Sequence, residues 1–133
     1  MRKSTDDRPR GIGPRQILVV EDDGSISKLL NIILDQQGYI VTVAANYESA
    51  LAAVQNAEPS LVLLDIGLPD GNGLDLLKWI RDDAGLSTPV VVLSAFRQDE
   101  NVQRAFELGA NDFLSKPFRP KELMARLERV LEQ

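Results

Sequence analysis

Three continuous runs of aliphatic residues constrain the fold of this chain more than any other feature. They are QILVV at 16–20, LVLL at 61–64 and PVVVL at 89–93. Runs of this kind, without alternating polar residues, are typical of strands covered on both faces, as in a parallel sheet. A weaker strand is predicted at 39–44 and a short one at 112–115. Together the five segments predict a largely buried parallel sheet.

Apolar residues with helical spacing lie between and after these strands. The first pattern runs from Ile26 to Leu34 and is followed by Gly38, a natural C-cap. Similar patterns cover 47–54, 74–80, 102–106 and 123–131. The alternation predicts an α/β fold of the (βα)5 type, an open doubly wound parallel sheet with helices on both faces. We expect one domain at 16–133 after a flexible tail at 1–15.

Composition excludes several classes of function. A net charge of −5 does not favour binding to nucleic acid or to an anionic membrane. Without cysteine the chain has no disulfides and no thiolate chemistry, which is compatible with a cytoplasmic location. Without histidine it lacks the commonest general base and cannot carry a phosphohistidine. No apolar run approaches the roughly 20 residues that span a bilayer.

Polar side chains follow four of the predicted strands. Because the carboxyl ends of parallel strands meet at one edge of a sheet, we expect these side chains to lie together there. They are Glu21, Asp22 and Asp23 after the first strand, Asp65 at the third, Ser94 at the fourth and Lys116 at the fifth.

Each of these residues alone also has a structural explanation, as a helix cap, a turn residue or a surface ion pair. A cluster is harder to explain that way, because neighbouring carboxylates repel unless a cation joins them. A divalent metal together with Lys116 would balance Glu21, Asp22 and Asp65. Mg²⁺ fits best, since it takes hard oxygen ligands and needs few carboxylates when a phosphate is also bound. Mg²⁺, a lysine, a hydroxyl and a carboxylate indicate phosphoryl transfer, in which an aspartate can be the nucleophile.

Four ordered segments of the chain resemble the receiver domain of two-component response regulators. They are ILVVEDD at 17–23, LLDIGLPDGNG at 63–73, VVVLSA at 90–95 and GANDFLSKPF at 109–118. The resemblance extends over about residues 16–132 and implies a flavodoxin-like fold with strand order 2-1-3-4-5. It also implies a phosphorylation-dependent signalling switch, which is not a conventional enzyme because it catalyses only its own phosphorylation and dephosphorylation.

The resemblance implies a role for each matching residue. Asp65 would accept the phosphoryl group. Glu21, Asp22, Asp65 and the backbone carbonyl of Gly67 would bind Mg²⁺, with Asp22 the more direct ligand of the acidic pair. Asp23 fits a helix-capping role better than a metal role.

Further residues are assigned in the same way. Ser94 and Lys116 would contact the phosphoryl oxygens, and Phe113 would be a switch aromatic, although static packing is an alternative for it. The Lys116–Pro117 peptide is expected to be cis, which is cheap only before proline.

Three positions depart from the family pattern. The acidic pair begins with Glu21 in place of aspartate, and Phe113 stands where a tyrosine is common. Gly67, two residues after the acceptor, has no side chain to orient water. We therefore predict that the phosphoryl group is long-lived.

The stretch 109–126 resembles receivers of the OmpR/PhoB winged-helix class. In that class, charged residues of the fourth helix, fifth strand and fifth helix pair across a homodimer. Asn111 and Val102 replace charged residues, and a solvated charged face is the alternative. The residues assigned to a possible dimer face are Arg104, Glu107, Asp112 and Arg126.

The expected partner is a sensor histidine kinase or a phosphotransfer protein that donates to Asp65. Two other functions remain open: a phosphorylation-independent binding module, and an aspartyl-phosphate hydrolase. The hydrolase would need a second acid near the acceptor, which Ile66 and Gly67 do not supply. A stand-alone receiver and a receiver separated from an effector domain are both compatible with the sequence, which does not identify the kinase, the signal or the output.

Overall fold

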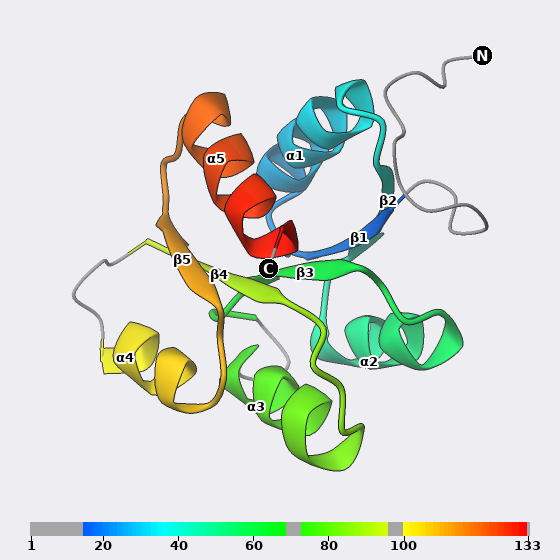
Figure 1. The fold of residues 1–133 in the computed structure, drawn as a ribbon, viewed down its shortest axis with the longest axis vertical. Helices are drawn as coiled ribbons and strands as arrows, with labels where there is room; N and C mark the ends of the chain where they lie inside the picture. The colour runs from blue at the N-terminus through cyan, green and yellow to red at the C-terminus, as the bar shows by residue number, and fades with distance from the viewer. Residues whose placement is uncertain (1–14, 69–72, 96–99, 133) are drawn as a thin grey trace.

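The computed structural model describes residues 15–68, 73–95 and 100–132. Its five strands form one parallel sheet in the order β2-β1-β3-β4-β5, which confirms the predicted topology (Figure 1). The strands are β1 (Gln16–Val20), β2 (Ile40–Ala44), β3 (Leu61–Asp65), β4 (Val90–Ser94) and β5 (Asp112–Ser115). The predicted tail before Arg15 and part of the turn that follows Asp65 lie outside the described residues.

Helices cover both faces of the sheet, as predicted. In Figure 1, α1 and α5 lie on one face, and α2, α3 and α4 lie on the other. The helices are α1 (Gly24–Gln36), α2 (Tyr47–Asn56), α3 (Gly73–Lys78), α4 (Glu100–Glu107) and α5 (Pro120–Leu131). A π-helix, η1 (Trp79–Asp83), continues α3. The sequence did not predict η1, because apolar spacing does not distinguish hydrogen bonds to the fourth residue from those to the fifth.

The core consists of two layers, one on each side of the sheet. Ile17 and Val19 of β1 belong to the layer under α1 and α5, whereas Leu18 and Val20 belong to the opposite layer. Successive side chains of a strand point to opposite faces, so a strand covered on both faces must be apolar at every position. All five residues of β3 and of β4 are buried.

Helix ends agree with the sequence signals better than helix faces do. Gly38 has a positive φ of 92°, and the amides of Gly38 and Tyr39 bind carbonyls of the last turn of α1, which is a Schellman cap. Leu29 and Phe106, expected on buried stripes, are instead 44% and 46% exposed. The spacing rule marks a stripe that is wider than the face of the helix in contact with the sheet.

Candidate functional site

Three carboxylates meet at the carboxyl edge of the sheet. Glu21 and Asp22 directly follow β1, and Asp65 is the last residue of the neighbouring β3. One oxygen from each of the three groups lies within 4.8 Å of the other two. Glu21 and Asp65 are buried, at 1% and 7% exposure, whereas Asp22 is exposed. The three acids meet at one edge, as predicted from the order of the strands, and two of them are buried while the third faces solvent.

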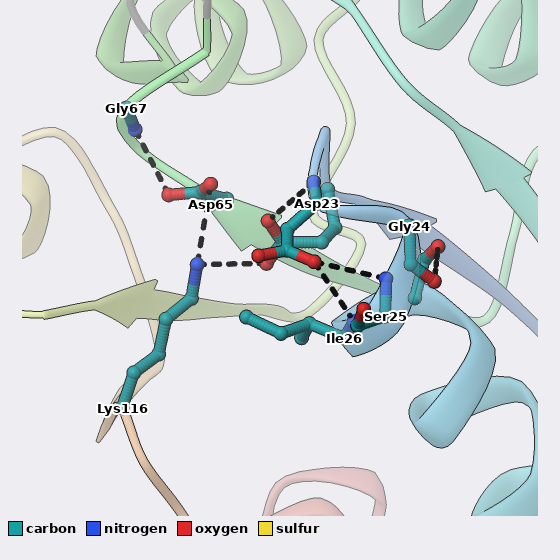
Figure 2. A network of polar contacts seen from close by, with 9 residues as sticks. Asp23, Gly24, Ser25, Ile26, Asp65, Gly67 and Lys116 are labelled. Atoms are coloured by element: carbon teal, nitrogen blue, oxygen red, sulfur yellow. Dashed lines mark hydrogen bonds and ion pairs between the residues drawn. The ribbon is translucent and has the colours of Figure 1, made fainter.

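Lys116 is the cation that joins two of these acids. It follows β5, and its Nζ lies 2.8 Å from Glu21 Oε1 and 3.3 Å from Asp65 Oδ2 (Figure 2). Burial by itself would lower the pKa of Lys116, but the hydrogen bond to Glu21 and the charges of Asp65 and Glu21 outweigh it, and the pKa is raised. Lys116 is therefore positively charged at neutral pH.

Glu21 is a buried acid whose surroundings disfavour its charged form. Burial raises its pKa, and the charge of Asp65 adds to this effect, while hydrogen bonds from Lys116 and the Asp23 backbone oppose it. Glu21 Oε1 is buried, and its close contact at 2.8 Å is with the charged Nζ of Lys116. A buried acceptor of this kind, beside two further carboxylates, suits a hard divalent cation that prefers oxygen ligands.

Asp65 is held in a defined position and is also accessible. Gly67 N donates a hydrogen bond of 3.0 Å to Asp65 Oδ1, as Figure 2 shows. A pocket of about 170 Å³ opens beside this carboxylate. Its lining residues come from the ends of three strands and from one helix, and they are Asp65, Ile66, Gly67, Ser94, Ala95, Asn101 and Lys116.

Ser94 and Asp23 lie where the sequence predicted them, the first beside the acceptor and the second at the start of α1. Ser94 ends β4, is 4% exposed and lines the pocket. Asp23 caps α1 by accepting hydrogen bonds from the backbone of Ser25 and Ile26, at 2.9 and 3.3 Å (Figure 2). The preference for a capping role of Asp23 over a metal role is thus confirmed by its contacts.

The two glycines that flank the turn after Asp65 have opposite surroundings. A Cβ on Gly67 would lie 3.7 Å from Asp65 Oδ1, which is an ordinary contact. A Cβ on Gly73 would lie 2.6 Å from the backbone oxygen of Asp65 and 2.5 Å from Ile66 Cα, which the fold does not permit. The sequence identified Gly73 only as a turn residue, whereas its absent side chain lets α3 begin directly against the acceptor strand.

Asn101 is the pocket residue that sequence reasoning missed. It lies in the first turn of α4 and lines the same pocket as Asp65 and Lys116. No motif marks it, because its approach to the pocket depends on how α4 packs on the sheet.

The remaining predicted residues take defined places around the site. The Lys116–Pro117 peptide is cis, as expected. Phe113 is half-buried and packs against the core layer under α2, α3 and α4, on the opposite side of β5 from α5.

The residues assigned to a dimer face have partners within the chain. Arg126 Nη1 lies 2.8 Å from Asp112 Oδ1, and Arg129 binds the other oxygen of Asp112. Arg104 and Glu107 form an exposed pair at 3.5 Å. The predicted pairing of these groups across a dimer stays a prediction.

Comparison with known proteins identifies the family. The response regulator receiver domain matches residues 17–128 of this chain. The chain belongs to this family. As a receiver domain, it is the part of a response regulator that acts as a signalling switch, and its acidic cluster is of the kind at which such domains bind Mg²⁺.

Its relatives include transcriptional regulators of the OmpR/PhoB class. The chain is 41% identical over 119 residues to the DNA-binding response regulator MtrA of Mycolicibacterium paratuberculosis. It is 40% identical over 120 residues to the phosphate regulon transcriptional regulatory protein PhoB of Klebsiella pneumoniae. Each alignment covers 90% of this chain and 52% of the relative, so the chain spans about half the length of the curated relatives it matches.

Solved structures agree with the fold. A putative response regulator from Chloroflexus aurantiacus superposes with a TM-score of 0.83 at 35% identity, over 90% of this chain and 99% of that one. No helix among the described residues is both long and apolar enough to span a membrane.

Proposed function

We propose that this receiver domain accepts a phosphoryl group on Asp65 from the phosphohistidine of a sensor kinase or phosphotransfer protein. The observation that carries the proposal is the position of Asp65 among Lys116, Ser94 and two further acids, beside an open pocket. We further propose that it works in the cytoplasm, with its donor.

Mg²⁺ is the cofactor that the cluster fits. Glu21, Asp22 and Asp65 would hold it, together with the carbonyl of Gly67, and it would supply charge neutralisation to the phosphoryl oxygens. The surplus of three carboxylates over one lysine supports this assignment, because the like charges repel while they remain unbalanced.

The residues of the chain provide the rest of the chemistry. An oxygen of Asp65 attacks the phosphorus, a P–O bond forms, and the P–N bond of the donor breaks so that its imidazole leaves. Lys116 neutralises charge on the phosphoryl group, and Ser94 donates a hydrogen bond to it. Because the strand that carries Asp65 is buried throughout, the nucleophile is held in position for in-line attack.

The output is a change in partner affinity at the surface formed by α4, β5 and α5. The added charge of about −1.5 to −2 draws Ser94 and Lys116 together, and Phe113 reorients. We propose a homodimer through this surface, which also exposes Phe106. Ion pairs across this dimer would involve groups such as Asp112, which in the single chain already pairs with Arg126 and Arg129.

The central experiment is incubation of the chain with a small phosphodonor, with and without Mg²⁺, followed by intact mass measurement. We expect the addition of one base-labile phosphoryl group that requires Mg²⁺. Asp65→Asn should abolish it, because the amide is not a nucleophile. Asp23→Asn is the matched control, since it keeps the helix cap and should leave phosphorylation unchanged.

The same experiment separates the two other functions. A phosphorylation-independent binding module would gain no phosphoryl group under any condition. An aspartyl-phosphate hydrolase would consume many equivalents of donor per chain without accumulating the modified protein. Either result would overturn the proposal.

A further inference from the structure

Arg81 links η1 to the chain just after it and to the distant Gly109–Asn111 segment, at the end of α4 farther from Asp65. It belongs to η1, and its guanidinium donates to the carbonyl of Leu86 at 2.9 Å and to that of Gly109 at 3.2 and 2.9 Å. It also donates to Asn111 Oδ1 at 3.0 Å. All of these acceptors are neutral oxygens, so toward them the guanidinium serves as a multiple hydrogen-bond donor, which we call the Arg81 clamp.

The backbone conformation of Gly109 and its lack of a side chain allow Arg81 to approach closely. It follows α4 with a positive φ of 109°, and the amides of Gly109 and Ala110 bind the carbonyls of Phe106 and Ala105, which is a Schellman cap. A Cβ on Gly109 would lie 2.9 Å from Arg81 Nε. The glycine therefore satisfies both the cap and the close approach of Arg81. The positive charge of the Arg81 guanidinium also interacts favourably with the negative, carboxyl end of the α4 helix dipole.

Asn111 extends the clamp to the sheet. Its side-chain Oδ1 accepts hydrogen bonds from the backbone N–H of Val90, at 2.9 Å, and from Arg81. The backbone N–H of Asn111 donates to the Val90 carbonyl at 2.8 Å. Asn111 replaces a charged residue of the OmpR/PhoB pattern, and in this structure its side chain links Arg81 to Val90 within the chain. The carboxyl end of α4 is thereby tied to η1 and to the start of β4.

The amino end of α4 lies at the phosphorylation pocket and not at the Arg81 clamp. Asn101, in its first turn, lines the pocket beside Asp65, Ser94 and Lys116. The helix has eight residues, so its ends are about 12 Å apart. A phosphoryl group in the pocket would therefore act on the end of α4 that Arg81 does not hold.

We propose that Arg81 makes the carboxyl end of α4 a fixed pivot, so that phosphorylation moves the amino end of this helix while the Leu108–Asn111 segment stays in place. This inference rests on the proposed phosphorylation of Asp65. In this proposal, the hydrogen bonds among Arg81, Gly109 and Asn111 determine which end of α4 moves when Asp65 is phosphorylated.

Amide hydrogen exchange of the full chain tests the pivot in two comparisons. The first compares the unmodified and phosphorylated protein, after intact mass has shown that the phosphoryl group is present. We expect exchange to change at Asn101–Arg104 and to remain unchanged at Leu108–Asn111, whose amides are all hydrogen-bonded. An equal change at both ends of α4 would overturn the proposal.

The second comparison needs no phosphodonor. Arg81→Lys keeps the charge but loses the forked geometry, and we expect exchange at Leu108–Asn111 to become about tenfold faster. Asn111→Ala should do the same, and Asn111→Asp should restore slow exchange because it keeps the acceptor oxygen. Lys78→Met is the matched control, since Lys78 on the preceding turn forms an exposed ion pair with Asp82 and does not take part in the Arg81 clamp.

The outcomes for the function and for the pivot are distinguishable. If no phosphoryl group is incorporated, the proposed function fails and the pivot fails with it, while the donor-free comparison still decides whether Arg81 anchors the segment. If phosphorylation occurs and Arg81→Lys exchanges like the unaltered chain at Leu108–Asn111, the clamp has no anchoring role and the proposal is wrong.

Discussion

Gly67 and Gly73 illustrate how one residue type serves two purposes within the same turn. Gly73 is required by packing, because a side chain there would collide with the backbone of the acceptor strand. Gly67 has no such constraint, and its amide fixes one oxygen of Asp65. The missing side chain at Gly67 is therefore a chemical feature of the site, since the fold would accommodate a Cβ there.

Gly67→Asn is expected to shorten the lifetime of phosphorylated Asp65 about tenfold, because a carboxamide next to the acceptor can orient an attacking water. The lifetime is measured by the loss of phosphoryl mass after removal of the donor. Gly67→Ala adds a Cβ without a polar group and should behave like the unaltered chain. Equal shortening in both variants would show that the effect is steric, contrary to this prediction.

Among the secondary-structure elements, β5 and α5 are joined by a buried acid between two arginines. Burial alone would raise the pKa of Asp112, but hydrogen bonds from Arg129 and the Phe113 backbone, with the charges of Arg126 and Arg129, lower it below its ordinary value. An acid with a lowered folded pKa stabilises the fold above its unfolded pKa of about 3.9, and this stabilisation is lost as the pH falls through the folded value.

Asp112→Asn should therefore lower the free energy of unfolding at neutral pH by about 2 kcal/mol, because charge-assisted hydrogen bonds to two partly exposed arginines are lost. The difference from the unaltered chain should shrink as the pH falls below about 4, because the unfolded chain then binds a proton at Asp112 before the folded chain does. Urea unfolding at several pH values measures both effects. Glu122→Gln, which removes a partly exposed acid 3.7 Å from Arg126, is the control and should cost less than about 1 kcal/mol. A pH-independent difference would contradict the assigned role of Asp112.

At the scale of the whole molecule, the strand order brings charges from the first, third and fifth strands to one edge. The three acids there are balanced in part by Lys116, which binds Glu21 and Asp65 at once. A cation that binds only the folded state stabilises it in proportion to the logarithm of its concentration.

Mg²⁺ at ten times its dissociation constant is therefore expected to stabilise the fold by about 1.4 kcal/mol. That corresponds to a rise in Tm of about 3–6 °C for a domain of this size. Thermal unfolding with Mg²⁺ and with a chelator measures the shift. Asp22→Asn should reduce it, whereas Asp23→Asn should retain it because Asp23 caps α1 and lies outside the cluster. An undiminished shift in Asp22→Asn would rule out the assigned ligands.

Much of the fold could be predicted because its signals are local. Each apolar run identifies a strand without reference to the rest of the chain, and Gly38 and Asp23 mark helix ends through their own backbone contacts. The exposed positions of Leu29 and Phe106 could not be predicted, because helical spacing does not report how much of a helix face the sheet covers. The participation of Asn101 in the pocket depends likewise on helix packing.

The sequence by itself determined the five strands, their parallel arrangement and the residues delivered to the carboxyl edge, since a buried strand must be apolar until it reaches solvent. Only the tertiary structure decided which of these groups touch and which glycines are indispensable. The Glu21–Lys116 pair, the packing of Gly73 on Asp65 and the clamp of Arg81 on Gly109 each join segments that are separate in the chain. Such contacts are set by distances between packed elements, and those distances exist only after the sheet and its helices have assembled.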